Sequence, residues 1–412
     1  MRVVILYNTS WYVFLLRRNL IRALQRAGCD IAVIAPEDAY TERVKALGVS
    51  FVPLALSPRS VNPASEALTI FSTYRALRSA RPDWVLSYTA KCNLYAGLAR
   101  PLVGFRQVAN VSGLGEGFQR AGALQAVMRR LYRRALFRCD QVFFQNSDDY
   151  ELCISAGLAD RSRSTIIPGS GVDLSAFVPA PKPFPGPITF LMFGRLLPQK
   201  GFASFIRAAG ALKQRYGERV AFWILGAADY ERPESLKLLE EIMAAHAAGS
   251  IRYLQSTDDV RSILRDTDVA VLPSTYNEGV PRSLLEALAC GKVVVTTDWK
   301  GCRETVVDGR NGLLVPTYDD AALQDALERI ILMPDAERLR MGAEGRALAE
   351  RRFDERIVIE AYKGILGLSR VMQLPSRKSA ALARGASAAE KAAPPRSLGH
   401  PRQEGHERPS WQ

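Results

Sequence analysis

The apolar residues of the chain alternate between short continuous runs and longer stretches with helical spacing. An apolar run at residues 2–8 is followed by a helical pattern from Trp11 to Ala27, which Gly28 closes, and by a second apolar run at 31–35. Apolar positions that recur every three to four residues predict a helix, whereas short continuous runs predict buried strands. The chain therefore opens as strand, helix, strand, which is a parallel βαβ unit.

The same alternation continues on both sides of a proline-rich joint at residues 179–187, whose composition is that of a stiff linker. Before the joint, further strands are predicted at 51–54, 84–87, 107–111, 141–144 and 165–167. After it, strands are predicted at 188–193, 220–225, 251–254, 269–272 and 293–297, with helices at 201–215, 234–247, 259–266 and 281–290. This alternation predicts an α/β protein of two Rossmann-like, doubly wound lobes with a cleft between them.

We place the N-terminal lobe at residues 1–180 and the C-terminal lobe at 181–353. Helical pattern returns at 319–333, 335–352 and 354–369, and the helix at 354–370 is expected to pack back on the N-terminal lobe. Residues 375–412 are rich in Ala, Pro, Ser and Arg and poor in hydrophobic residues, which predicts a disordered basic tail.

Composition narrows the class of protein. A chain of 412 residues with 48% hydrophobic residues can bury two sizeable cores. Its six cysteines are scattered without a CxxC pair, which favours reduced thiols in the cytoplasm over disulfides or zinc. No stretch approaches the roughly 20 apolar residues that span a bilayer, so any membrane contact is expected to be peripheral.

The formal net charge of +13 is unevenly distributed. Residues 1–180 hold 22 Lys and Arg against 13 Asp and Glu, residues 181–374 hold 26 against 26, and residues 375–412 hold 7 against 3. A basic N-terminal lobe suits an anionic lipid surface, a phosphorylated substrate or nucleic acid. Nucleic acid is disfavoured because the chain has neither interleaved aromatic residues nor a recognisable nucleic-acid module.

The densest polar motif is PSTYNEGVPRSLLEA at residues 273–287. It follows a predicted strand, and Pro281 is predicted as the first residue of a helix. Ligands bind at the carboxyl edge of such sheets, where free helix amides favour a diphosphate. Glu278 and Glu286 could then accept hydrogen bonds from sugar or ribose hydroxyl groups. The alternative is that Glu278 caps the helix and Glu286 faces solvent.

A second motif, GRLLPQKG at residues 194–201, directly follows the first strand of the C-terminal lobe. Arg195 and Lys200 would lie at the same sheet edge as Glu278. There they could neutralise the charge that builds on a departing diphosphate, which contributes a few kcal/mol per donor. The alternative is an ordinary solvated turn.

Together these motifs resemble the retaining glycosyltransferases of family 4, which have the GT-B fold. The resemblance is carried by GRLxxxKG at residues 194–201, by the E-x7-E pair Glu278 and Glu286, and by GCRETVxDGxNGLLV at residues 301–315. It extends over nearly the whole chain, to about residue 370.

The resemblance implies that Arg195 and Lys200 bind the diphosphate of a UDP-sugar donor, that Glu278 contacts the donor sugar, and that Glu286 holds the ribose. It implies transfer with retention of the anomeric configuration, without a metal or another cofactor. Catalytic roles are expected for Arg195, Lys200 and Glu278. The expected donor site comprises Gly194, Arg195, Lys200, Glu278, Gly279, Val280, Pro281 and Glu286.

Two features bear on the chemistry. The chain has three histidines, His246, His400 and His406, so a histidine acid–base in the N-terminal lobe is excluded. Many family members do have a histidine there, and this chain departs from them.

The tripeptide Asp266-Thr267-Asp268 has the form of a metal-binding DxD motif, but it precedes a predicted strand and so lies away from the ligand edge. Asp148-Asp149 and Asp258-Asp259 are expected as helix N-terminal acids.

Three loops of the N-terminal lobe should face the cleft on the acceptor side. Each follows a predicted strand, and Gly113 and Gly115 would let backbone amides approach a phosphate or sugar, although a plain glycine-rich turn is equally simple. The segments AKCNLYAG, NVSGLG and GSGVDL are similar to those of the subgroup that extends polyprenyl-diphosphate-linked acceptors, some of which transfer N-acetylgalactosamine. The candidate acceptor-side residues are Asn8, Thr9, Ser10, Lys91, Asn93, Asn110, Gly113 and Gly115.

Two basic amphipathic stretches are candidates for contact with an anionic membrane. Residues 119–138 place apolar residues on one stripe and six arginines around the rest, and Trp11 to Arg18 form a second candidate. The alternative for both is an ordinary amphipathic helix that packs on a sheet.

The function predicted is transfer of an N-acetylhexosamine or hexose from a UDP-sugar to a polyprenyl-diphosphate-linked saccharide, in bacterial surface glycan or glycoprotein glycan assembly. The enzyme would act at the inner face of the cytoplasmic membrane. The alternatives are a sugar-nucleotide epimerase of the same fold, which the E-x7-E pair disfavours, and a glycosyltransferase that uses a soluble acceptor.

Overall fold

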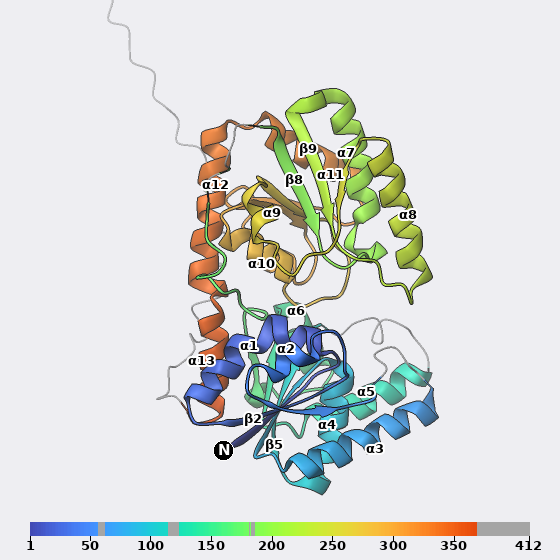
Figure 1. Cartoon of the computed structure of the whole chain (residues 1–412), viewed down its shortest axis with the longest axis vertical. Helices are drawn as coiled ribbons and strands as arrows, with labels where there is room; N and C mark the ends of the chain where they lie inside the picture. Colours follow the sequence, from blue (N-terminus) through green and yellow to red (C-terminus); the bar gives the residue numbers. More distant parts are fainter. Residues whose placement is uncertain (57–61, 114–122, 181, 183–185, 369–412) are drawn as a thin grey trace, which may run out of the picture. The chain divides into compact units, whose positions relative to one another are not determined.

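The computed structural model describes residues 1–56, 62–113, 123–180, 182 and 186–368. The predicted disordered tail at 375–412 and Gly115 lie outside these residues. Met1–Leu368 form one compact unit, which contains a seven-stranded and a six-stranded sheet among the described residues (Figure 1).

The N-terminal sheet is parallel throughout, with the strand order β3-β2-β1-β4-β5-β6-β7. The strand order reverses between β1 and β4, so the connections that follow these two paired strands run to opposite faces of the sheet and leave a crevice at the carboxyl ends. The strands are β1 (Arg2–Leu6), β2 (Asp30–Ala35), β3 (Ser50–Pro53), β4 (Trp84–Tyr88), β5 (Arg106–Val111), β6 (Gln141–Phe144) and β7 (Ser164–Ile166).

Helices cover both faces of this sheet because the strands are apolar on both faces. Val3 and Ile5 pack with α1, α2 and the C-terminal helix α13 (Glu355–Ile365), whereas Val4 and Leu6 pack with α3 and α4. In Figure 1, α3, α4 and α5 lie together on one side of the blue and cyan lobe. The helices are α1 (Ser10–Arg26), α2 (Thr41–Lys45), α3 (Pro63–Ala80), α4 (Ala90–Val103), α5 (Ala123–Leu136) and α6 (Ser147–Ser155).

The C-terminal sheet repeats this design with the order β10-β9-β8-β11-β12-β13. Its strands are β8 (Ile188–Phe193), β9 (Val220–Leu225), β10 (Arg252–Leu254), β11 (Val269–Leu272), β12 (Val293–Thr297) and β13 (Gly312–Val315). Its helices are α7 (Phe202–Tyr216), α8 (Pro233–Ala247), α9 (Arg261–Arg265), α10 (Arg282–Ala289), α11 (Asp320–Leu332) and α12 (Asp335–Leu348). The α/β fold class predicted from the alternation is confirmed. The strand β13 was not anticipated, because it has four residues and begins with a glycine.

After α12 and a π-helical turn at Ala349–Phe353, the chain returns to the N-terminal lobe as α13 (Glu355–Ile365). The crossing point is fixed by two backbone hydrogen bonds, from Val172 N to Phe353 O at 2.8 Å and from Glu355 N to Val172 O at 3.0 Å. Val358 and Tyr362 of α13 are buried in the core of the N-terminal lobe. The C-terminal lobe is therefore connected to the N-terminal lobe at two places, by the proline-rich joint and by α13.

Candidate active site

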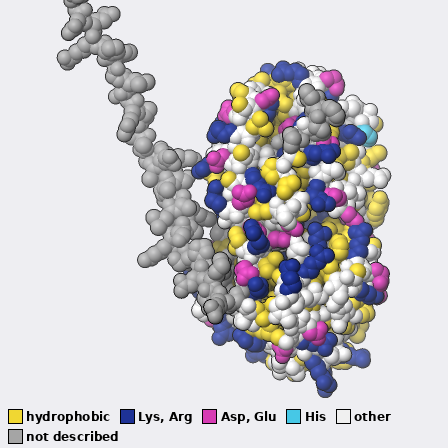
Figure 2. All heavy atoms as spheres, turned by 60° about the vertical axis from the view of Figure 1, so that its left-hand side comes forward, with side chains coloured by type: hydrophobic (Ala, Val, Ile, Leu, Met, Phe, Trp, Pro, Cys, Tyr) yellow, Lys and Arg dark blue, Asp and Glu magenta, His cyan; other side chains and the backbone are white. Residues whose placement is uncertain are grey.

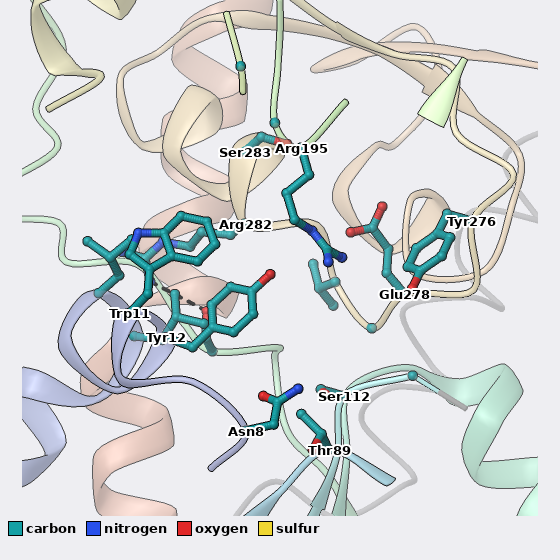
Figure 3. Close-up of a pocket in the computed structure, with 18 of the residues that line it drawn as sticks. Asn8, Trp11, Tyr12, Thr89, Ser112, Arg195, Tyr276, Glu278, Arg282 and Ser283 are labelled. Atoms are coloured by element: carbon teal, nitrogen blue, oxygen red, sulfur yellow. Dashed lines mark hydrogen bonds between the residues drawn. The ribbon is translucent and has the colours of Figure 1, made fainter. Parts of the chain in front are cut away.

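A cavity of about 810 Å³ lies between the carboxyl ends of the two sheets. Its walls follow β1, β4 and β5 in one lobe and β8, β9 and β11 in the other, which are the strands around the two points where strand order reverses. Figure 3 shows Arg195 and Glu278 entering it from the C-terminal lobe, with Asn8, Thr89 and Ser112 on the opposite side. This volume is in the range of small-molecule sites.

The turn after β8 carries two cationic side chains, Arg195 and Lys200, that line this cavity. Arg195 extends into the middle of the cavity, and Lys200 lies in a short 3-10 turn with its side chain only 8% exposed. Gly201 has φ +86°, and a Cβ there would lie 2.3 Å from Pro273 O, so only glycine lets this turn reach the end of β11. The two motifs found in the sequence therefore meet at one sheet edge.

Lys200 Nζ lies 3.3 Å from Glu278 Oε2, and Glu278 Oε1 accepts a hydrogen bond from Ser274 Oγ at 3.4 Å. Tyr12, followed by Tyr276 and Glu278, raises the pKa of the Arg195 guanidinium, which stays cationic. Arg195, Lys200 and Glu278 therefore bring two cations and one carboxylate together in one wall of the cavity, where water is partly excluded and their fields are strong.

The helix α10 points its N-terminus at the same cavity. It begins at Arg282, with Pro281 as the N-cap residue and not as the first helical residue as predicted. No side chain of the described residues caps this end, so Glu278 is not a helix cap. Arg282 and Ser283 line the cavity, and the amides of an uncapped helix start favour an anion. Pro281 itself is buried and lies outside the lining.

Glu286 lies one turn into α10 and also lines the cavity. Its side chain is 15% exposed and accepts a hydrogen bond from Arg282 Nε at 2.8 Å, so it does not face solvent. Burial raises the pKa of Glu286, and the neighbouring Arg282 opposes that shift. A carboxylate held in this way can accept hydrogen bonds from vicinal hydroxyl groups. The remaining expected donor-site residues Gly194, Gly279 and Val280 line the cavity as well.

The acceptor-side candidates divide into residues at the cavity and residues with structural roles. Asn8, Lys91 and Gly113 line the cavity. Thr9 is instead the N-cap of α1, and Ser10 donates to Pro36 O. These two small polar residues follow β1 because they begin the helix.

Asn93 and Asn110 are also corrected by the structure. Both are fully buried: Asn93 Nδ2 donates to Asn110 O at 2.9 Å, and Asn110 Nδ2 donates to the Tyr362 hydroxyl at 3.0 Å. They link β5 to α4 and α13 and do not reach the cavity. Buried amides need such partners, and a pattern in the sequence cannot distinguish them from ligand-binding amides.

The loop after β5 touches the C-terminal lobe at the site itself. Gly279 N donates to Ser112 O at 3.0 Å, and Asn146 Nδ2 donates to Glu278 O at 3.4 Å. Gly113 has φ +115°, and a Cβ there would lie 2.6 Å from Asn277 O. The N-terminal lobe therefore supports the loop that carries Glu278.

Several cavity residues were missed in the sequence, among them Tyr12, Thr89 and Tyr276. Asp258 was expected as a helix N-terminal acid. It instead pairs with Arg43 Nη1 at 2.5 Å and with the Tyr40 hydroxyl, across the rim of the cleft. The first helical residues of α6 do include Asp148 and Asp149, as predicted.

Several residues of helix α1 that one interpretation of the sequence assigns to a membrane surface line the cavity instead. Trp11, Leu15 and Arg17 line the cavity, and Phe14 packs against Tyr40 with ring centroids 5.9 Å apart. Its aromatic residues are therefore used inside the cleft. The side chains of residues 119–128 lie outside the described part of the chain, so the first half of the other candidate helix has no structural account.

The described residues hold no group of three or more His, Cys, Asp or Glu side chains that could bind a metal ion. Asp268 of the DxD tripeptide accepts hydrogen bonds from Thr189 N and Lys182 Nζ, both at 2.8 Å, at the sheet edge away from the cavity.

All six cysteines are buried free thiols. None of the described helices combines the length and hydropathy of a membrane span.

The sequence matches two families of known domains. Residues 17–169 match the glycosyl transferase 4-like domain, and residues 177–348 match the glycosyl transferases group 1. A relative from Campylobacter jejuni, N,N'-diacetylbacillosaminyl-diphospho-undecaprenol alpha-1,3-N-acetylgalactosaminyltransferase, is 29% identical over 388 residues, which are 88% of this chain and 97% of the relative.

Solved structures share the fold at low identity. HepE of Anabaena, solved with UDP and glucose, superposes with a TM-score of 0.74 at 18% identity and covers 89% of this chain and 99% of HepE. Sucrose-phosphate synthase of Thermosynechococcus elongatus gives 0.72 at 17% identity, with 90% and 100% covered. The chain belongs to the group 1 glycosyltransferases with a glycosyl transferase 4-like N-terminal domain, and it has the GT-B arrangement of two Rossmann-like lobes.

Proposed function

We propose that this glycosyltransferase moves a sugar from a UDP-sugar to a saccharide linked to a polyprenyl diphosphate, with retention of configuration and without a metal ion. The observation that carries the proposal is the meeting of Arg195, Lys200 and Glu278 in one cavity beside the open N-terminus of α10. Two cations and free amides suit a diphosphate, and the carboxylates suit hydroxyl groups.

The proposed reaction exchanges one bond for another on the same face of the donor sugar. The bond from the anomeric carbon to the diphosphate oxygen breaks, and a bond from that carbon to the acceptor oxygen forms. The proton of the acceptor hydroxyl passes to the departing phosphate oxygen. Arg195 and Lys200 stabilise the negative charge on the diphosphate as it leaves, and Glu278 orients the sugar. A strong protein base is not needed, which fits an N-terminal lobe without histidine.

Two observations support a lipid-linked acceptor: the name of the Campylobacter relative and the exposed residues of helix α3. The Campylobacter relative is named for a diphospho-undecaprenol-linked acceptor. On this chain, Leu68 and Phe71 of α3 are 67% and 57% exposed, and the exposed side chains of Arg75 and Arg78 follow on the same helix. Exposed apolar side chains beside arginines suit the surface of an anionic bilayer. We propose that the α3–α5 side docks at the inner face of the cytoplasmic membrane.

The face of the molecule turned forward in Figure 2 differs from that proposed docking side. It shows Lys and Arg side chains interspersed with Asp and Glu. A mixed surface of this kind gains little from an anionic bilayer, because attraction and repulsion offset each other. The docking proposal therefore rests on the α3–α5 side alone.

The test of the reaction is UDP release from a panel of UDP-sugars in EDTA, with and without a polyprenyl-diphosphate-linked saccharide. We expect release with one UDP-sugar that depends on the acceptor. Epimerisation of a UDP-sugar without acceptor would indicate the epimerase alternative, and equal turnover of a soluble saccharide would remove the lipid-linked acceptor. Loss of activity in EDTA that Mn²⁺ restores would overturn the metal-independent mechanism.

The membrane proposal has its own test. Leu68→Ser/Phe71→Ser should weaken co-sedimentation with vesicles containing phosphatidylglycerol at least fivefold. Leu339→Ser is the matched control, because Leu339 is 74% exposed on α12 of the other lobe. Equal binding by both variants would exclude α3 as the docking helix.

A further inference from the structure

The strongest unexplained group in the cleft is Arg17 of α1. Arg17 lines the cavity together with Tyr7, and the residue is only 2% exposed. The guanidinium lies 4.2 Å from the centre of the Tyr88 ring, and its Nε has no hydrogen-bond partner among the described residues. A buried arginine stays charged, so its environment must compensate a full positive charge.

Among the described residues, the groups around Arg17 do not supply a negative charge. Its electrostatic partners are three tyrosines, Tyr88, Tyr7 and Tyr362, and it forms no ion pair with Asp or Glu in the described part of the chain. Burial raises the pKa of Tyr7 to about 12 and raises the pKa of Tyr88 as well, so both hydroxyl groups are neutral. The aromatic faces attract the cation, but no described residue compensates its net charge.

Two oxygen atoms on the same side of the cavity are also unpaired. Asn8 Oδ1 and Thr89 Oγ1 are shielded from solvent and have no hydrogen-bond partner among the described residues. Figure 3 shows Asn8 and Thr89 side by side on the floor, with Ser112 next to them. Unsatisfied buried oxygens are rare, and each is costly unless a ligand supplies a donor.

The backbone at Thr89 is strained. Its φ of 72° and ψ of 156° lie in a region that β-branched residues almost never adopt. This conformation places Thr89 at the carboxyl end of β4 where the strand order reverses. Strain of this kind persists where the surroundings impose it, most often at ligand sites.

We propose that this floor is a subsite for a phosphorylated sugar, in which Arg17 pairs with phosphate oxygens and Asn8 Oδ1 and Thr89 Oγ1 accept hydrogen bonds from sugar hydroxyl groups. The subsite faces Arg195 and Lys200 across the cavity. The N-terminal lobe would therefore bind the phosphate of the acceptor, and the C-terminal lobe would bind the diphosphate of the donor. The assignment rests on the proposed function for its acceptor, because a sugar diphosphate carries both the anion and the hydroxyl groups. The neutral tyrosine walls make Arg17 selective for a charged acceptor over an uncharged glycoside.

The test compares Arg17→Gln with Arg17→Lys on two acceptors, a short-chain prenyl-diphosphate sugar and the alkyl glycoside of the same sugar. Arg17→Gln should raise KM for the diphosphate acceptor at least tenfold, and it should raise KM for the UDP-sugar and for the alkyl glycoside much less. Arg17→Lys should restore part of the loss. Arg22→Gln is the control, because it removes an exposed charge from the same helix. Equal losses on both acceptors would overturn the assignment.

A binding measurement decides the inference even if no transfer is found or Arg17→Gln does not fold. Inorganic pyrophosphate is titrated calorimetrically into wild-type protein saturated with UDP, which occupies the donor site. One further pyrophosphate should bind, and Thr89→Val should leave that binding unchanged while raising KM for both acceptors. Absence of pyrophosphate binding to the UDP-saturated protein would overturn the subsite, whereas absence of transfer alone would overturn only the proposed function.

Discussion

Lys200 and Glu278, which are 78 positions apart in the chain, form an ion pair of 3.3 Å at the floor of the C-terminal half of the cleft. The Lys200 side chain is 8% exposed and that of Glu278 is 18% exposed. Because both are poorly solvated, removal of either one leaves a charge without its partner. The pair therefore couples the turn proposed to bind the diphosphate to the loop proposed to bind the sugar.

Glu278→Ala should abolish transfer without unfolding the protein, and Lys200→Ala should lower donor-dependent turnover at least a hundredfold. The physical reason is the loss of charge stabilisation and of sugar orientation at the reacting bond. Steady-state kinetics with thermal unfolding as a control would measure both effects. Normal turnover in the two variants would remove these residues from the active site.

Glu286→Gln should raise the stability of the fold and lower the affinity for the UDP-sugar. Burial raises the pKa of Glu286, so the folded protein favours the protonated carboxyl group. The stability that this protonated group contributes is fully present below the pKa of Glu286 in the unfolded chain, and it is lost as the pH rises through the higher pKa of the folded protein. At pH 8 the variant should therefore unfold at a higher temperature than wild type, and the difference should shrink toward pH 4.5. Its affinity for the UDP-sugar should fall. A stability gain that is the same at both pH values would contradict the assigned burial effect.

Gly113→Ala should lower kcat/KM at least tenfold and destabilise the fold by about 1–3 kcal/mol, because the added Cβ would lie 2.6 Å from Asn277 O at a positive φ. Gly210→Ala is the matched control. Gly210 lies inside α7, and a Cβ there meets nothing within 4 Å, so alanine should stabilise by about 0.5–1 kcal/mol. Chemical denaturation of both variants measures the contrast; a similar effect at the two sites would argue against a tight contact between the lobes.

Asp258→Asn should loosen the rim of the cleft with little effect on stability. The contact between Asp258 and Arg43 is half exposed, so its loss should cost at most about 1 kcal/mol and less in high salt. Small-angle scattering should detect a larger radius of gyration in the variant at low salt. An unchanged radius together with unchanged kinetics would show that this contact does not hold the lobes.

The half of the site that is expected to bind the donor could be located from the sequence because each of its two motifs is continuous in the chain. A strand followed directly by a glycine turn or a helix start places its polar residues at the sheet edge, so GRLLPQKG and the segment around Glu278 could be assigned to one place without coordinates. The acceptor half was not predictable in this way. Asn8 reached the cavity, whereas Asn93 and Asn110, which have the same chemistry and similar positions, became buried structural links.

Hydrophobic periodicity in the sequence determined the two α/β lobes, because strands buried on both faces require continuous apolar runs and their helices require an amphipathic stripe. Only the tertiary structure decided the role of α1. Its basic and aromatic residues fit a membrane helix equally well in sequence, but packing placed Arg17 beneath Tyr88 in the cleft and Phe14 against Tyr40. The direction in which an amphipathic face is buried depends on neighbours far along the chain, and local sequence does not encode them.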